Sequence, residues 1–338
     1  MADSFNTIIN SSLSVSRRGV INDPFTSTSS VGGISIIVCT YNRSKYLYDA
    51  LESIAGNDFP RNEYEIILVN NNSTDDTEEK CKQFAANFPN VNFKYCTESN
   101  QGLSHARNKG IAESNGDFLV FLDDDVVVKS DYIRNLKTNL DNTPDLMAFG
   151  GKITPRFEAG HPPKWLNRWM YSLISATNCP DKAQKYGKRK YPIGANMGFR
   201  RQCLEKSGYF NTELGRTGNI LLGGEEKDIF LKIKDLEMAI YYFPNVEIEH
   251  IIPESRTTEE YIVRVGLGVG ISERIRCTSA VKQSLRKRYF QEYVKWGGTI
   301  VLAAYYTLTF RLQVAKVMWK FRSNVTKGLF NPDKSNLL

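Results

Sequence analysis

The segment GDFLVFLDDD, residues 116–125, combines an almost unbroken apolar run with three consecutive aspartates. Such a run after a glycine is typical of a β-strand that is buried on both faces of a sheet. Three adjacent carboxylates at a strand end repel one another unless a cation neutralises them. We therefore predict a strand over residues 117–122 that presents Asp123, Asp124 and Asp125 as oxygen ligands for Mn²⁺ or Mg²⁺. The alternative is a solvated acidic turn.

Strand and helix patterns alternate on the N-terminal side of this segment. Two apolar runs and one short alternating run predict three more strands, over residues 34–40, 65–69 and 91–95. Apolar side chains at helical spacing predict the intervening helices, which include residues 47–54, 81–88 and 103–112. This alternation is typical of an α/β fold with a mostly parallel sheet flanked by helices.

Polar clusters follow three of these strands, at residues 40–43, 70–76 and 123–125. Ligands of open α/β sheets bind at the carboxyl ends of the strands. We therefore expect the three clusters to line one crevice. Asp75 and Asp76 are expected to cap the helix that follows them rather than to contact a ligand.

The pattern is less regular beyond residue 126. Thr257 and Glu260 have the spacing of a capping box at the start of a predicted helix. The glycines of GLGVG, residues 266–270, lack the spacing of a dinucleotide-binding loop, so we expect them to permit close helix packing. Trp165 and Trp169 could stack on a sugar ring, but packing is the favoured role of both.

Charge is distributed unevenly along the 338 residues. The formal net charge is +7, yet residues 264–338 hold 14 Lys or Arg and 3 Asp or Glu, a surplus of 11 that leaves −4 for the remainder. Apolar residues make up 41% of the chain, which is enough for a full hydrophobic core. A basic C-terminal region can contact anionic lipid, nucleic acid or an acidic polymer.

The stretch GGTIVLAAYYTLTF, residues 297–310, lies between basic clusters at residues 286–288 and 311–322. It is too short to span a bilayer, but it suits a helix in a membrane interface, with a buried core helix as the alternative. Residues 1–32 show no secretory signal and are expected to form a flexible extension. The six cysteines form no C-x-x-C pair, which fits a reducing compartment. We predict a cytoplasmic protein, peripheral on the inner face of an anionic membrane.

Five segments, in this order and spacing, resemble the family 2 glycosyltransferases with the GT-A fold: ISIIVCTYNR, ILVNNNSTDDT, ESNQGLSHARNKGI, GDFLVFLDDD and GGEEKD. The resemblance implies a GT-A glycosyltransferase domain at residues 33–255, between the extension at residues 1–32 and a basic, mainly helical region at residues 256–338. It also implies inverting, metal-dependent transfer of a hexose from a nucleotide sugar, expected to be a UDP-sugar. The acceptor would be a hydroxyl of a glycan or lipid-linked molecule in polysaccharide or glycoconjugate biosynthesis.

The resemblance assigns the nucleotide pocket residue by residue. Thr40, Tyr41 and Arg43 would line it at the end of the first strand. Asn70 and Asn71 stand where the family usually has an acidic residue that holds the base or ribose. Their amides can still hydrogen-bond a uracil edge or a hydroxyl.

The same resemblance assigns the diphosphate and the metal. Arg107 would lie near the diphosphate, where a cation is favourable; an ordinary ion-pair partner is the alternative. Asp123 would face the ribose and Asp125 the metal, while Asp124 could serve either. Asp123 and His250 would complete the ligands of the Mn²⁺ or Mg²⁺ ion.

The segment GGEEKD would supply the general base that removes a proton from the acceptor hydroxyl. The family usually shows Glu-Asp here, and the second position is Glu226 in this chain. Glu225 and Asp228 are the competing candidates. A charged helix start is the alternative, since acidic residues favour helix N-termini. Asn196 matches a loop that faces the sugar or the acceptor in the family.

Three other functional classes fit the sequence less well than a glycosyltransferase. A nucleotidyltransferase should carry a glycine-rich loop after the first strand, where this chain has the glycine-free residues 40–43. A non-catalytic sugar-nucleotide or glycan-binding protein with the same fold would not need the carboxylates of Asp125 and Glu226. A nucleic-acid binder would spread its charge over the fold rather than confine it to one end, so we expect no nucleic-acid partner.

Overall fold

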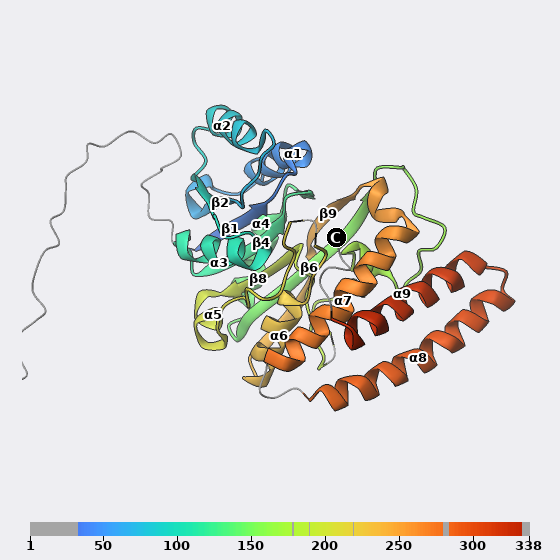
Figure 1. The fold of residues 1–338 in the computed structure, drawn as a ribbon. Helices are drawn as coiled ribbons and strands as arrows, with labels where there is room; N and C mark the ends of the chain where they lie inside the picture. Colours follow the sequence, from blue (N-terminus) through green and yellow to red (C-terminus); the bar gives the residue numbers. More distant parts are fainter. Residues whose placement is uncertain (1–32, 178, 189, 219, 280–283, 333–338) are drawn as a thin grey trace, which may run out of the picture.

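The computed structural model describes residues 33–177, 179–188, 190–218, 220–279 and 284–332, so the expected extension at residues 1–32 lies outside the described residues. In the described part of the chain, helices cover both faces of one nine-stranded sheet, and three long helices lie to one side of it (Figure 1). The strand order is β3-β2-β1-β4-β8-β6-β9-β5, and the short strand β7 pairs with β9. The predicted α/β architecture with a helical C-terminal region is therefore confirmed.

One half of the sheet is parallel and comes from the N-terminal part of the chain. Here β1 pairs in parallel with β2 and β4, and β2 pairs in parallel with β3. The bounds are β1 Ile34–Thr40, β2 Tyr64–Asn70, β3 Phe93–Thr97 and β4 Phe118–Asp123. The strand β3 lies two residues later than predicted, because Val91 packs into the core from the turn before it. All four strands end at the same edge of the sheet.

The other half of the sheet is mixed in direction. Strand β8 is antiparallel to both β4 and β6, β6 is parallel to β9, and β9 is antiparallel to β5 and β7. The bounds are β5 Val126–Val128, β6 Leu146–Phe157, β7 Gln184–Lys185, β8 Asn196–Arg200 and β9 Ala239–Ile252. Since β5 pairs Val126 with His250, this half places His250 directly beside the acidic end of β4.

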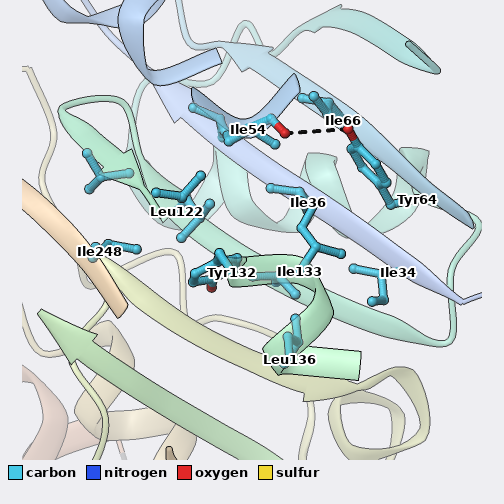
Figure 2. Packing of buried hydrophobic residues seen from close by; sticks show 14 of the residues in the cluster. Ile34, Ile36, Ile54, Tyr64, Ile66, Leu122, Tyr132, Ile133, Leu136 and Ile248 are labelled. Carbon is cyan, nitrogen blue, oxygen red and sulfur yellow. Dashed lines mark hydrogen bonds between the residues drawn. The ribbon is translucent and has the colours of Figure 1, made fainter. Parts of the chain in front are cut away.

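Two apolar clusters fix the shorter helices on opposite faces of the sheet. One face is covered by α1 Ser44–Ala55, α2 Thr77–Asn87 and α4 Tyr132–Asn142, and the other by α3 Leu103–Glu113, α5 Arg201–Ser207 and α6 Glu225–Asp235. Figure 2 shows the first cluster, which includes Ile36 of β1. The Tyr64 hydroxyl donates a hydrogen bond of 3.4 Å to the carbonyl of Ile54. Strands buried on both faces explain the continuous apolar runs of the sequence.

Three long helices form the C-terminal region: α7 Glu259–Ser279, α8 Leu285–Leu308 and α9 Leu312–Phe330. Helix α7 packs against α9 closely enough that a Cβ atom at Gly266 would lie 2.9 Å from the carbonyl oxygen of Phe321. The expectation of close helix packing at residues 266–270 is thus confirmed. Helix α8 lies on the outside of this group (Figure 1). Among the described residues, no helix is both long and apolar enough to cross a membrane.

Two local predictions for the C-terminal half were wrong. Helix α7 is capped by Thr258, whose hydroxyl accepts a hydrogen bond of 3.1 Å from the amide of Tyr261, while the Thr257 hydroxyl donates to the carbonyl of Glu254. The residue that caps the helix is therefore Thr258 rather than the predicted Thr257. Trp165 is buried and donates to the Thr257 carbonyl at 2.7 Å, but Trp169 is 54% exposed, so only the first tryptophan packs in the interior.

Candidate active site

A cavity of about 1120 Å³ opens where β1 and β4 end. Its walls come from the loop after β1, the end of β4, the start of α6, one face of α7, and parts of α8 and α9. The three polar clusters predicted to converge all contribute, through Thr40, Asn71 and Asp123 among others. A cavity of this size can enclose a nucleotide sugar with room for part of a second substrate.

Hydrogen bonds hold the loop after β1 and the loop after β2 together. Asn42 has a left-handed backbone conformation with φ 51°. Its backbone N–H donates to the hydroxyl of Ser73, and its side-chain Oδ1 accepts from the backbone N–H of Thr74 at 2.7 Å. Asp75 accepts from the amide of Ser44 at 3.0 Å and from Thr77, so its carboxylate caps the starts of α1 and α2. The capping role expected for Asp75 is thereby confirmed, although Asp75 also lines the cavity, whereas Asp76 makes no capping hydrogen bond through its side chain. These bonds fix the position of Tyr41 and Arg43 at the cavity rim.

Asp125 is the most deeply buried member of the acidic motif, with 0% exposure. Its Oδ2 atom forms ion pairs with Arg43 and, at 3.2 Å, with Arg256. Burial alone would raise the pKa of Asp125, but His250, Arg43 and Arg256 hold it well below its ordinary value. Asp125 is therefore a carboxylate at neutral pH.

Asp124 is also buried but is less strongly neutralised. It accepts a hydrogen bond of 2.7 Å from Thr40 and lies 3.5 Å from the Nε atom of Arg43. Burial raises its pKa to about 6, against the opposing effect of Arg43. Asp124 thus ties the end of β4 to the end of β1, and it lines the cavity together with Asp123.

Asp123, Asp125 and His250 form a cluster that could hold a divalent cation, since one ligand atom of each lies within 4.8 Å of the others. His250 Nδ1 lies 3.2 Å from the carbonyl oxygen of Ile174. Nε2 lies 3.2 Å from Asp125 Oδ1 and 3.4 Å from Nη1 of Arg256, whose guanidinium also pairs with Asp125. Carboxylate oxygens and an imidazole nitrogen this close together are a donor set that suits a divalent cation.

Arg107 connects the acidic motif to the start of α6. It is buried on α3, lies 2.8 Å from Glu225 and 3.9 Å from Asp123, and lines the cavity. The alternative role for this arginine, an ordinary ion-pair partner at the surface, does not match its 3% exposure, and its ion pair with Glu225 is buried near the acidic motif. One oxygen of Glu225 is therefore held by a cation, while its Oε2 atom is buried and has no hydrogen-bond partner among the described residues.

Glu226 differs from Glu225 in having no ion-pair partner among the described residues, although the Oε2 atoms of both carboxylates lack a hydrogen-bond partner. The Oε2 atom of Glu226 is buried, and the side chain lines the cavity. Burial and the charge of Glu225 raise the pKa of Glu226 to about 8, although Arg107 opposes the shift. A Cβ atom at Gly194 would lie 2.7 Å from Arg107 and 3.5 Å from Glu226, so the glycine leaves room for this pair of side chains.

Several predicted site residues are held by hydrogen bonds within the protein. Asn70 does not line the cavity and bonds Tyr95 and the Ser73 amide. The Asn71 amide is used up by the backbone, since it donates to two carbonyls and accepts from the amide of Gly102 at 2.7 Å. Both amides are engaged by neighbouring loops, and of the two only Asn71 lines the cavity, so contact of either residue with a base stays a prediction.

Asp228 and Asn196 also lie outside the cavity lining. Asp228 forms an ion pair of 2.8 Å with Lys232 one helical turn later, which makes it a less favoured candidate for the base. Asn196 is fully buried and joins three segments: it accepts from the Tyr132 hydroxyl at 2.8 Å and donates to the carbonyls of Lys152 and Val246. Its role is structural rather than in substrate contact.

Sequence reasoning missed several residues that line the cavity. Arg256, Arg216, Tyr191 and Tyr261 are the principal ones. Arg256 lies in a short 3-10 helix just after β9 and pairs with Asp125. These residues come from segments without a local motif, and only the fold brings them to the acidic end of β4.

The chain is similar in sequence to known proteins. The sequence profile described as Glycosyl transferase family 2 matches residues 35–208. The glucosyl-dolichyl phosphate glucuronosyltransferase of Haloferax volcanii is 25% identical over 251 residues, which cover 72% of this chain and 76% of that protein. The dolichyl N-acetyl-alpha-D-glucosaminyl phosphate 3-beta-D-2,3-diacetamido-2,3-dideoxy-beta-D-glucuronosyltransferase of Methanococcus voltae is 32% identical over 102 residues. These residues cover 30% of this chain and 32% of that protein.

A solved structure shares the overall fold. The mannosyltransferase PcManGT from Pyrobaculum calidifontis, in complex with GDP-Man and Mn²⁺, superposes with a TM-score of 0.62 and 16% sequence identity. The superposition covers 92% of each chain, so it includes the C-terminal helices as well as the sheet.

Proposed function

Because this chain belongs to glycosyl transferase family 2 and is a glycosyltransferase, we propose that it transfers a sugar from a nucleotide-sugar donor to a hydroxyl of a lipid-linked glycan acceptor. The carrying observation is that the acidic motif of β4 and the unpartnered carboxylate oxygen of Glu226 line one cavity. The dolichyl phosphate in the names of two relatives supports a lipid-linked acceptor. Release of nucleoside diphosphate from a panel of nucleotide sugars tests the proposal, and no release from any donor would contradict it.

The donor would occupy the end of the cavity next to the acidic motif. Thr40, Tyr41 and Arg43 border this end, and a UDP-sugar is the proposed donor. A Mn²⁺ or Mg²⁺ ion bound by Asp123, Asp125 and His250 would supply positive charge that stabilises the departing nucleoside diphosphate. Arg107 and Arg216, which also line the cavity, would add to that positive charge.

Glu226 is the proposed general base. Its free oxygen would accept the proton of the acceptor hydroxyl while the hydroxyl oxygen attacks the anomeric carbon and the bond to the nucleoside diphosphate breaks. Attack opposite the leaving group inverts the anomeric configuration. We prefer Glu226 to Glu225, which keeps an ion pair with Arg107, and to Asp228, which lies outside the cavity lining.

The pKa of Glu226 predicts a pH dependence. A base with a pKa of about 8 is mostly protonated at pH 7, so kcat/KM should rise with pH and level off above about pH 8. The Glu225→Gln variant removes the charge that helps to raise this pKa, so the acid limb should move to lower pH. Rates at saturating metal between pH 6 and 9.5 measure both profiles. An acid limb that does not move in Glu225→Gln would contradict the assignment.

Helix α8 is the proposed contact with an anionic membrane. Its exposed surface and the adjoining turn carry large apolar side chains, among them Phe290, Tyr293, Val294, Ile300, Val301, Tyr305, Leu308 and Phe310. Residues 296–310 hold no charge, and Glu292, which is buried, is the one acidic residue in the sequence from 285 to 330. Apolar and aromatic side chains flanked by Lys and Arg are favourable in the interface of an anionic bilayer. This surface contradicts the alternative of a buried core helix.

Substitution on α8 tests the membrane contact better than truncation, because removing the C-terminus would also remove α9, which packs on α7. The double variant Val301→Glu/Leu308→Glu should lower binding to vesicles of phosphatidylglycerol and phosphatidylcholine at least about tenfold. Leu236→Glu, which changes an exposed leucine of the sheet domain, is the matched control. Equal sedimentation of the double variant and the wild type with vesicles would refute the contact.

A further inference from the structure

The end of the cavity away from the acidic motif is lined by the C-terminal helices and is strongly basic. Four helices meet here: α6, α7, α8 and α9. Four cations that line the cavity face two carboxylates, which leaves a surplus of two positive charges: Lys227, Arg288, Lys295 and Arg322 against Glu273 and Glu292. Partly buried charges without compensation are unfavourable, so a surplus of this kind indicates a site for an anion.

Glu273 neutralises part of this charge from α7. It accepts from Lys227 at 2.5 Å, from Arg276 at 3.0 Å and from Arg288 at 2.8 Å. These contacts hold the pKa of Glu273 far below its ordinary value despite burial. One carboxylate is therefore shared by three cations.

Glu292 neutralises another part from α8. It pairs with Arg288 at 2.9 Å and with Arg322 at 3.1 Å. The Nε atom of Arg322 is buried and has no acceptor among the described residues. An N–H group in this state is costly unless a ligand oxygen bonds to it.

Lys295 has no hydrogen-bond or ion-pair partner for its ammonium group within the described ranges of the chain, although it lines the cavity. The residue as a whole is exposed, yet its ammonium group lies near other cations. Partial burial and the charges of Arg288 and Lys227 lower its pKa to about 8. A bound anion would raise the pKa of this lysine, because an opposite charge favours the protonated form.

We propose that this basic end of the cavity, lined by Lys227, Arg288, Lys295 and Arg322, binds a phosphate group of the acceptor. The inference rests on the proposed function, because it names the chemistry that the acceptor carries. Arginine and lysine are the side chains that bind phosphate oxygens most strongly. Since Glu226 precedes Lys227 in α6, a phosphate held here would place the attached glycan beside the proposed base.

The phosphate could come from a lipid phosphate or from a soluble sugar phosphate. Helix α8 carries Lys295 and Arg288 on the side toward the cavity, while Val294 and Val301 are exposed on the same helix. A lipid phosphate bound at Lys295 would therefore leave its chain close to an apolar surface. Binding of farnesyl phosphate, farnesol and glucose 1-phosphate distinguishes the two sources.

The test is isothermal titration of the full chain with each of these three probes. Farnesyl phosphate should bind the wild type, and Lys295→Gln should weaken it at least about tenfold, since one charge-assisted contact is lost. Lys295→Glu should abolish binding. Lys287→Gln, an exposed lysine of the same helix that does not line the cavity, should leave the affinity unchanged. Glucose 1-phosphate binding as tightly as farnesyl phosphate would keep the subsite but assign it to a soluble phosphate.

Farnesol binding as well as farnesyl phosphate would overturn the proposal, and so would equal affinity of the wild type and Lys295→Glu for farnesyl phosphate. Thermal melting shows that each variant is folded. Metal-dependent release of nucleoside diphosphate by the wild type is measured in parallel. Release of nucleoside diphosphate together with a failed phosphate test would contradict the phosphate subsite alone. No release would count against the proposed function itself.

Discussion

Replacing Glu226 by glutamine is expected to lower kcat for sugar transfer by about 10²–10⁴-fold while changing the donor KM little. The amide keeps the shape of the side chain but cannot accept the proton of the acceptor hydroxyl. Glu226 lines the cavity without an ion pair among the described residues, whereas the neighbouring Glu225 keeps one oxygen on Arg107. Steady-state kinetics with the donor and acceptor varied separately measure both constants.

The control lies two residues further along α6. Asp228→Asn changes a carboxylate of the same first helical turn that pairs with Lys232 and does not line the cavity. Its kcat should remain within about threefold of the wild type, because surface substitutions of this kind have small effects. A large loss in Asp228→Asn with a small one in Glu226→Gln would transfer the base to Asp228.

Replacing Asp125 by asparagine is expected to abolish metal binding and to reduce transfer by at least about 10²-fold. The neutral amide removes the charge that the cation requires, and it also leaves Arg43 and Arg256 without their buried partner. Loss of one partner of a buried ion pair costs about 3–5 kcal/mol of stability. Mn²⁺ titration, transfer assays and urea unfolding measure the three effects on one preparation.

Asp181→Asn is the control for this prediction, since Asp181 is an exposed carboxylate paired with Lys152. It should change neither metal affinity nor transfer, and its stability should stay within about 0.5 kcal/mol of the wild type. His250→Gln adds a second check, because it removes a nitrogen ligand without removing the charge of Asp125. Wild-type Mn²⁺ affinity in both Asp125→Asn and His250→Gln would remove the metal site from these residues.

The parallel half of the fold was predictable because its signals are local. Strand β1 begins and ends where the apolar run does, and the aspartates stand at the end of β4 as expected. Because parallel strands end at the same edge of a sheet, the sequence predicts that Thr40 lies near Asp124. The structure gives that contact as a hydrogen bond of 2.7 Å.

The rest of the site depends on orientation and on distant segments, which local patterns do not encode. Glu226 and Asp228 are separated by roughly 200° around the helix axis, so only one of them can face the cavity. A sequence pattern does not show which one does. Asn70 and Asn71 are polar and well placed along the chain, but their amides are consumed by neighbouring loops. Arg256 reaches Asp125 only because β5 and β9 pair.

The basic C-terminal region shows the same limit. Its surplus of charge was visible in the sequence, and so was the uncharged stretch at residues 297–310. The division of that charge between a membrane-facing surface and a cavity wall was not visible, because it depends on the packing of α7 against α9. The cavity wall formed by Lys295 and Arg322 emerged only from the folded chain.

The most direct test of catalysis by this cavity is isothermal titration of UDP-, GDP-, CMP- and dTDP-sugars into the wild type and Asp125→Asn, with and without Mn²⁺. We predict that one nucleotide class binds the wild type, that Mn²⁺ strengthens this binding, and that Asp125→Asn loses the metal effect. Identical donor affinity with and without Mn²⁺ in both proteins, or no binding of any nucleotide sugar to folded wild type, would contradict the assignment of the donor site to the acidic end of β4.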